Sequence, residues 1–255
     1  MCDPSTPVGQ TPYIWRIPKN DRARAFKRSP EKSFRSSDRY TIHRPGGAKN
    51  LAIERALGQL ENDFVATINR LKKNSVLTSK ERTTLCWFTS AMFARTERTP
   101  DSIRQLLRGA QDQAARLERR RNASPTLSEE LNSMRINTAP DYVAIMTPKI
   151  ADVLSNMSLT ILVTGDNAGF ITSDEPCVQC IPYSRQRPFI GDPNVEFTMP
   201  LTPLHLALFT WRQQRDLYRP INEDVVDEAN SRAVFNCNRE FISWKGMIRD
   251  CWFSA

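Results

Sequence analysis

Glycine and histidine are scarce in this chain of 255 residues, which contains nine glycines and two histidines. A glycine-built phosphate cradle is difficult to place with so few, and the sequence has no nucleophile elbow, dinucleotide fingerprint or zinc-protease helix. His43 and His205 stand alone in the sequence, which limits acid–base chemistry based on histidine. Any enzymatic chemistry would therefore fall to carboxylates and a bound metal ion.

Long apolar runs are missing as well. No stretch of about eighteen apolar residues occurs, and the first residues lack the basic start and apolar segment of a secretory signal. The six cysteines are scattered through a chain long enough to fold without crosslinks. Cys177 and Cys180 have the spacing of half a zinc site, but no second pair of Cys or His residues completes it. We therefore expect a cytoplasmic protein with reduced thiols and no transmembrane segment.

The charged residues are biased towards the positive sign. Lys and Arg number 36 and Asp and Glu number 28, which gives a formal net charge of +8. Hydrophobic residues make up 40% of the chain, an ordinary share for a globular protein. The basic balance favours nucleic acid or another polyanion as a partner but does not define its specificity, and it leaves the oligomeric state open.

The length favours one domain, which we place at residues 13–255 after a disordered segment at 1–12 that is rich in Pro, Ser and Thr. Residues 13–48 form a basic region with a predicted β-hairpin, 49–156 a helical region, and 157–255 a β-rich region with a C-terminal helix. The predicted fold class is α+β, with a helical N-terminal half of long amphipathic helices packed with a β-rich C-terminal section.

Helical patterns dominate the first half of the chain. Apolar residues at spacings of three and four predict a helix over 49–73. A capping-box pattern that begins at Thr78 predicts the start of a second helix, and Pro100 suits the first turn of a third. The third helix carries an apolar stripe that includes Leu106 and Leu117, with a basic, solvated face opposite.

In the second half of the chain, helical patterns give way to strand patterns. Two further helices are expected at 127–135 and 140–156, the latter bent at Pro148 because proline removes a backbone hydrogen bond. Short runs rich in β-branched and aromatic residues then predict strands separated by turns. Asn222 is a predicted helix cap, and residues 239–248 read as a last strand.

Four segments carry a resemblance to a known family. ERTTLCWFTSAMFARTERTP ends in an Arg-Thr-Pro motif, GFITSDEP is similar to a Phe-Ile-Thr-Ser-Asp-x-Pro motif, and FTMPLTP and VVDEANSRAVFNC suit the regions that follow. Together they resemble the uncharacterised bacterial group catalogued as domain of unknown function 4238, over residues 13–245. The family usually opens with a His-x-x-Pro segment that has no counterpart here, so the resemblance implies a member that lacks this piece. It implies no particular activity.

Carboxylates supply the strongest candidates for chemistry. Asp174 and Glu175 follow a predicted strand and precede Pro176, a common place for residues that bind metals or abstract protons. Glu54 and Glu61 are seven residues apart and so share one face of the first long helix. If Asp174 folds against these two, the three carboxylates would bind Mg²⁺ or Mn²⁺ as a cofactor. The alternatives are a turn at Asp174 and a solvated or salt-bridged helix edge.

Basic residues form two candidate substrate-binding groups. Arg95 and Arg98 lie near the end of a predicted helix, where they would either clamp a phosphate or stabilise the helix dipole. Arg22, Arg24 and Arg28 lie in the basic N-terminal region near aromatic residues, where they would follow a phosphate backbone while the rings stack on bases. A merely solvated basic face is the alternative.

Three classes of function are therefore open. The first is a metal-dependent hydrolase that acts on nucleic acid or another phosphate ester, with Asp174, Glu175, Glu54 and Glu61 as acid–base or metal-binding residues. The second is a non-catalytic module that binds nucleic acid or a protein through the basic N-terminal segment. The third is a structural or assembly role.

Overall fold

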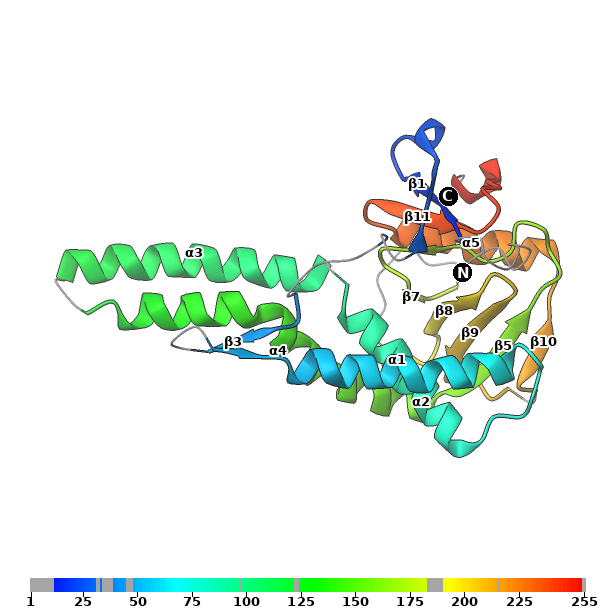
Figure 1. The fold of residues 1–255 in the computed structure, drawn as a ribbon, viewed down its shortest axis with the longest axis horizontal. Coiled ribbons are helices and arrows are strands. Elements are labelled where there is room, and N and C mark those ends of the chain that lie inside the picture. The colour runs from blue at the N-terminus through cyan, green and yellow to red at the C-terminus, as the bar shows by residue number, and fades with distance from the viewer. Residues whose placement is uncertain are drawn as a thin grey trace.

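The computed structural model describes most of the chain. The described residues are 12–30, 33, 39–44, 48–96, 98–121, 124–182, 190–214 and 216–253, without the side chains of Arg98 and Thr99. Apart from Pro12, the segment expected to be disordered lies outside the described residues. Figure 1 shows a body that contains the main sheets and a long helical arm that extends from it.

Helices account for most of the ordered chain. The described α-helices are α1 (Ala52–Leu71), α2 (Ser79–Ala94), α3 (Arg98–Arg121), α4 (Thr126–Asn156) and α5 (Glu223–Asn236), with short 3-10 helices η1 (Arg22–Arg24) and η4 (Asp250–Phe253). The capping box that begins at Thr78 is confirmed, because the Thr78 hydroxyl accepts from the N–H of Glu81 and the Glu81 carboxylate accepts from the N–H of Thr78. The Asn222 cap is also confirmed, with its side chain accepting from the N–H of Val225.

The expectation of two separate helices between residues 127 and 156 is wrong. α4 is one helix of 31 residues with Pro140 and Pro148 inside it. An interior proline costs about 3 kcal/mol or more in a helix. Here the helix packs against both α2 and α3, and it buries residues such as Ala139, Val143 and Leu154. Tertiary burial therefore outweighs the local preference.

The described strands form three sheets. They are β1 (Ile14–Pro18), β2 (Phe26–Arg28), β3 (Ile42–His43), β4 (Lys49–Asn50), β5 (Ser158–Val163), β6 (Thr172–Ser173), β7 (Val178–Cys180), β8 (Glu196–Thr202), β9 (His205–Thr210), β10 (Tyr218–Pro220) and β11 (Glu240–Ser243). The sheet orders are β2-β1-β11-β6, β10-β5-β9-β8-β7 and β3-β4. Only the β10–β5 pair is parallel among these described strands.

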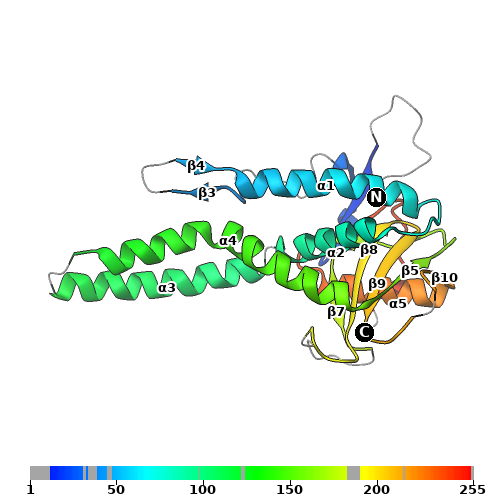
Figure 2. The ribbon, with the colours of Figure 1, turned by 90° about the horizontal axis from the view of Figure 1, so that it is seen from below.

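The fold is α+β, but the predicted division into a helical N-terminal half packed with a β-rich C-terminal section is wrong. β1 pairs with β11 from Trp15 opposite Ser243 to Pro18 opposite Glu240, so both ends of the chain share one sheet. Much of α3 and α4 leaves the sheets and forms the arm (Figures 1 and 2). Periodicity identifies a strand or a helix but does not name its partner.

The core lies on both faces of the five-stranded sheet. On one face, Leu71, Leu85 and Leu154 from α1, α2 and α4 pack with sheet residues such as Phe197 and Phe209. On the other face, Val226 of α5 packs with Leu162, Leu206 and Leu208. α5 also packs beneath the four-stranded sheet, so it lies between the two sheets (Figure 1). Because α5 packs against a sheet on each side, the loops next to it are held in place.

The apolar stripe predicted for α3 is only partly covered. Ala114 is buried, whereas Leu106 is 75% exposed and Leu117 is 50% exposed. The stripe is therefore wider than the surface that α4 covers.

None of the described helices is long and apolar enough to cross a membrane.

Candidate functional site

Asp174 closes the loop between α5 and β11. One carboxylate oxygen accepts from the N–H of Asn238 at 3.0 Å and the other from the N–H of Arg239 at 2.7 Å. The N–H of Asp174 donates to the carbonyl of Glu240 at 3.2 Å. Both oxygens thus bind backbone N–H groups, 64 and 65 residues away in the sequence, that would otherwise lack partners at the start of β11.

The local turn that the sequence offered as an alternative is made by Ser173, the neighbour of Asp174. The Ser173 hydroxyl donates to the carbonyl of Glu175 at 2.8 Å and accepts from its N–H at 3.1 Å. The side chain of Asn236 donates to the carbonyls of Glu175 and Cys177. Burial, followed by the charge and hydrogen bond of Asp174, raises the pKa of the Cys237 thiol well above its usual range. That thiol stays protonated at neutral pH and is a poor nucleophile.

Glu54, Glu61 and Arg95 meet around Tyr40, at the junction of α1 and α2. The Arg95 guanidinium contacts Glu61 at 2.5 Å and lies 5.2 Å from the centre of the Tyr40 ring. The Tyr40 hydroxyl donates to the Arg95 carbonyl at 2.9 Å, and the Tyr40 N–H donates to Glu54 at 3.2 Å. Burial by itself would lower the pKa of Arg95, but the hydrogen bond and charge of Glu61 raise it. These contacts tie the segment around Tyr40 to the helices.

The predicted three-carboxylate metal site is not formed. No group of three or more His, Cys, Asp or Glu side chains among the described residues could hold a metal ion. Asp174 follows β6 and binds the loop after α5, whereas Glu54 and Glu61 lie on α1; α1 and α5 cover opposite faces of the five-stranded sheet. The expected convergence depended on the tertiary fold, which no spacing in the sequence reports. The side chain of Arg98, the other predicted phosphate ligand, lies outside the described residues.

Arg22, Arg24 and Arg28 lie on the hairpin of β1 and β2, which pairs in antiparallel register. Arg22 contacts Asp250 at 3.2 Å and Arg24 contacts Asp21 at 3.0 Å. The Arg24 side chain is 82% exposed, and exposed ion pairs contribute at most about 1 kcal/mol. The hairpin cations are therefore available to an incoming anion.

Aromatic rings alternate with these cations. The Lys27 ammonium lies 4.3 Å from the centre of the Tyr13 ring and 5.2 Å from that of Trp15, and the Arg22 guanidinium lies 4.1 Å from that of Phe253. Gly246, with φ of +71°, leaves room for Trp15, because a Cβ there would lie 2.7 Å from the ring. β2 is an edge strand whose three residues are all exposed.

The excess positive charge of the protein lies in residues 12–50, and the part of it on the hairpin, residues 12–30, has six Lys and Arg and one Asp. Residues 12–50 contain eleven of the 36 Lys and Arg and only three of the 28 Asp and Glu. In the remainder of the chain, the two signs nearly balance. We call the two sides of the edge strand β2 together the hairpin surface: Lys27 and the partly exposed Tyr13 lie on one side, Phe26 and Arg28 on the other, and Arg24 precedes the strand.

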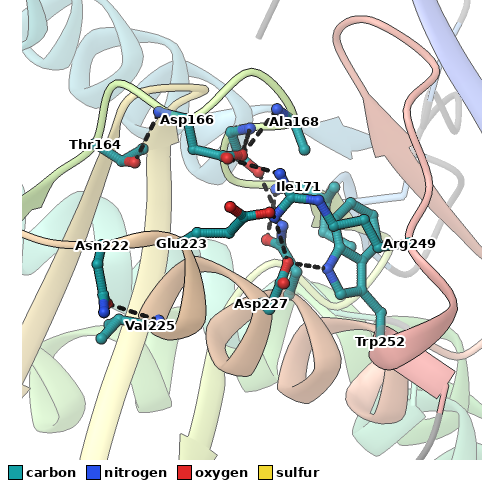
Figure 3. A network of polar contacts seen from close by, with 12 residues as sticks. Thr164, Asp166, Ala168, Ile171, Asn222, Glu223, Val225, Asp227, Arg249 and Trp252 are labelled. Carbon is teal, nitrogen blue, oxygen red and sulfur yellow. Dashed lines mark hydrogen bonds and ion pairs between the residues drawn. The ribbon is translucent and has the colours of Figure 1, made fainter.

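A polar network around Arg249 was missed by the sequence reasoning (Figure 3). Its guanidinium contacts Asp166 at 2.6 Å, Asp227 at 2.7 Å and Glu223 at 3.0 Å. The indole N–H of Trp252 also donates to Asp227, at 2.7 Å. Burial by itself would raise the pKa of Asp166, but hydrogen bonds, the largest from Arg249, lower it. The network fastens η4 and the loop after β5 to the start of α5.

The same loop is held by Asn230 of α5. The buried Asn230 side chain accepts from the N–H of Ile171 at 3.0 Å and donates to the carbonyl of Gly169 at 2.8 Å. Gly169 has φ of +62°, and a Cβ there would lie 2.5 Å from the carbonyl oxygen of Pro203. The glycine and asparagine together position the Phe-Ile-Thr-Ser-Asp segment. No sequence spacing connects Asn230 or Arg249 with this loop, so neither could be found from the chain alone.

These features define an α+β protein. Its Phe-Ile-Thr-Ser-Asp motif packs against α5, and the β1–β2 hairpin carries several exposed cations. Residues 8–245 match the family described as protein of unknown function (DUF4238), and the chain belongs to that family. The resemblance drawn from the motifs is thereby confirmed. No curated protein and no solved structure matches the chain.

Proposed function

We propose that the protein is a binding module that holds single-stranded nucleic acid on the hairpin surface. The observation that carries this proposal is the excess of positive charge on the hairpin, six Lys and Arg against one Asp in residues 12–30, next to the exposed ring of Phe26 on the edge strand β2. Lys and Arg side chains that contact phosphates release counterions and supply most of the sequence-independent affinity.

The rings favour nucleic acid over other polyanions. Phe26 is 40% exposed, and Tyr13 and Trp15 are partly exposed beneath the Lys27 ammonium. A base that stacks on an aromatic side chain contributes about 1–3 kcal/mol whatever its identity. In the bound state, Lys27 would move from the rings to a neighbouring phosphate and a base would take its place. Single strands expose the base faces that such stacking needs, whereas duplexes do not.

The carboxylates expected for a hydrolase have structural partners. Asp174 accepts two backbone N–H groups, and Glu61 is paired with Arg95. The binding hypothesis therefore has stronger support than the hydrolase hypothesis.

The test is fluorescence anisotropy of labelled single-stranded DNA and RNA and of duplex DNA, over a range of salt concentrations with chelator present. Binding should favour single strands and weaken steeply with salt. For Arg24→Gln with Arg28→Gln, the slope of log K against log salt should become shallower by about 1.4, because each lost phosphate contact removes about 0.7. Phe26→Ala should weaken binding about tenfold without changing the slope.

A matched control removes the same charge elsewhere. Lys80→Gln with Lys149→Gln deletes two exposed cations from the helices and should leave the slope and affinity nearly unchanged. Equal effects of the two double variants would refute a site on the hairpin. A parallel arm with Mg²⁺ or Mn²⁺ and no chelator would reveal strand cleavage, and its loss in folded Asp174→Ala would favour the hydrolase instead.

A further inference from the structure

The arm formed by α3 and α4 has a defined internal seam. Glu118 of α3 accepts from the N–H groups of Leu127 and Ser128 at 2.9 and 3.1 Å and from the Ser128 hydroxyl at 2.5 Å. Two turns further along, the Arg135 guanidinium donates to Gln111 at 3.2 Å. These contacts fix which face of each helix points inward, because both helices must present these residues to each other.

Large apolar side chains lie beside this seam and are uncovered. Leu117 precedes Glu118, Leu127 precedes Ser128 and Met134 precedes Arg135, with exposed fractions of 50%, 54% and 57%. One residue corresponds to about 100° around a helix. Because the two helices are antiparallel, residues that precede seam residues fall on the same side of the hairpin in both.

Two more residues extend this surface. Leu106, 75% exposed, lies eleven residues before Leu117, and Ile145, 54% exposed, lies eleven residues after Met134. Eleven residues are close to three full turns, so each pair shares one face. We call the surface of Leu106, Leu117, Leu127, Met134 and Ile145 the arm face. A monomer seldom exposes so many large apolar side chains on one continuous surface.

The arm face has the dimensions of a protein interface. α3 has 24 residues. At about 1.5 Å per residue and about 10 Å per helix, two helices present about 700 Å² on one side. Standard interfaces bury about 800 Å² per partner. The residues Leu106, Ala110, Gln113 and Leu117 also follow the alternating spacing of four and three that is typical of a helix–helix seam between chains.

The charges beside the arm face favour a second copy of this chain. Arg120 lies three residues after Leu117 on α3, whereas Glu130 lies three residues after Leu127 on α4. Asp141 adds a second negative charge along α4. The acidic α4 flank would be repelled by anionic lipid and by phosphate backbones, but it suits the basic tip of α3 in another copy.

We propose that the protein dimerises through the arm face, about a two-fold axis that runs along the arm. This axis lays α3 of each copy against α4 of the other and brings Arg120 of one copy to Glu130 of the second. The buried core is then a four-helix bundle whose apolar centre is made by the five residues of the arm face from each copy. The hairpin surface is not part of this interface, so dimerisation and nucleic-acid binding are separable.

Sedimentation velocity of the full-length protein without nucleic acid, over a wide range of concentrations, tests the proposal. The wild type should sediment as a dimer that dissociates on dilution. Leu106→Gln with Met134→Gln should raise the dimer dissociation constant on the order of a thousandfold, since four apolar side chains lose their burial. Circular dichroism melting at a concentration where the wild type is also dissociated should stay close to wild type, because both residues are exposed in the monomer.

The control is Ile136→Gln. Ile136 is 43% exposed on the same helix but lies two residues, or about 200°, beyond Met134, on the opposite side of the arm. This variant should dimerise like the wild type. A wild type that is monomeric throughout, or a control that dissociates as much as the arm-face variant, would overturn the proposal.

Charge reversal tests the arrangement of the two copies. Arg120→Glu and Glu130→Lys should each weaken the dimer, and the double variant should recover the wild-type dissociation constant because the pair is restored with opposite sign. Failure of the double variant to recover would overturn the two-fold arrangement. A monomeric wild type that instead binds vesicles of anionic phospholipid would make the arm face a membrane-binding surface.

Discussion

Replacing Arg249 by Gln is expected to lower the free energy of unfolding by about 2–3 kcal/mol, a value between those of exposed and fully buried ion pairs. The guanidinium is 20% exposed and neutralises Asp166, which is 11% exposed, and Asp227, which is 22% exposed. Without it, these two partly buried carboxylates lose their counterion. For a chain of this size, the loss corresponds to a decrease of about 4–12 °C in the melting temperature.

The assay is thermal and urea unfolding followed by circular dichroism, with Arg212→Gln as the control. Arg212 is exposed and donates one hydrogen bond to Asn194, so its loss should cost less than about 0.5 kcal/mol. Urea unfolding separates a change in midpoint from a change in slope. An Arg249→Gln protein as stable as the control would refute the inference that the network stabilises the fold.

The effect of Arg249→Gln should depend on pH. The pKa of Asp166 is lowered in the folded protein, and Arg249 supplies the largest of the hydrogen bonds that lower it. A carboxyl with a depressed folded pKa contributes stability above its unfolded pKa, about 3.9 for Asp, and loses it as the pH falls through the folded value. The stability difference between wild type and variant should therefore be full at pH 7 and shrink below about pH 4. A difference that is constant with pH would contradict this linkage.

Three further outcomes are expected. Gly169→Ala should cost about 2–3 kcal/mol in urea unfolding because of its positive φ and the nearby backbone, whereas Gly58→Ala, in an open position on α1, should be neutral or stabilise by up to about 1 kcal/mol. Asn230→Ala should cost about 2–4 kcal/mol, because it leaves a buried N–H and a buried carbonyl without partners; a loss below about 1 kcal/mol would count against this role. In iodoacetamide labelling of the native protein, read by mass spectrometry, Cys251 should react well before Cys177, which is fully buried with a strongly raised pKa.

Local signals were read correctly where a few neighbouring residues decide the structure. The Thr78 capping box and the Asn222 cap each need only a side chain and an amide three residues away. The apolar spacing of residues 49–73 likewise identified α1, which spans Ala52–Leu71.

The predictions failed where contacts between residues far apart in sequence determine the structure. The helices expected at 127–135 and 140–156 are not separate, because packing against α2 and α3 supports α4 through the residues between them. Asp174 does not join Glu54 and Glu61, because they belong to different sides of the five-stranded sheet. Leu106 satisfied the apolar period of α3 but is exposed, because the period does not say how much of a stripe a neighbour will cover.

From the sequence alone we could predict the starts of α2 and α5, most strand positions, the family, and the excess of positive charge in residues 12–50, because composition and short-range periodicity express these directly. Only the tertiary structure decided that β1 joins β11, that Arg249 gathers three carboxylates, and that the arm face is left uncovered. These features depend on which residues far apart in sequence come into contact in the folded protein, and the local spacing of residues does not specify those contacts.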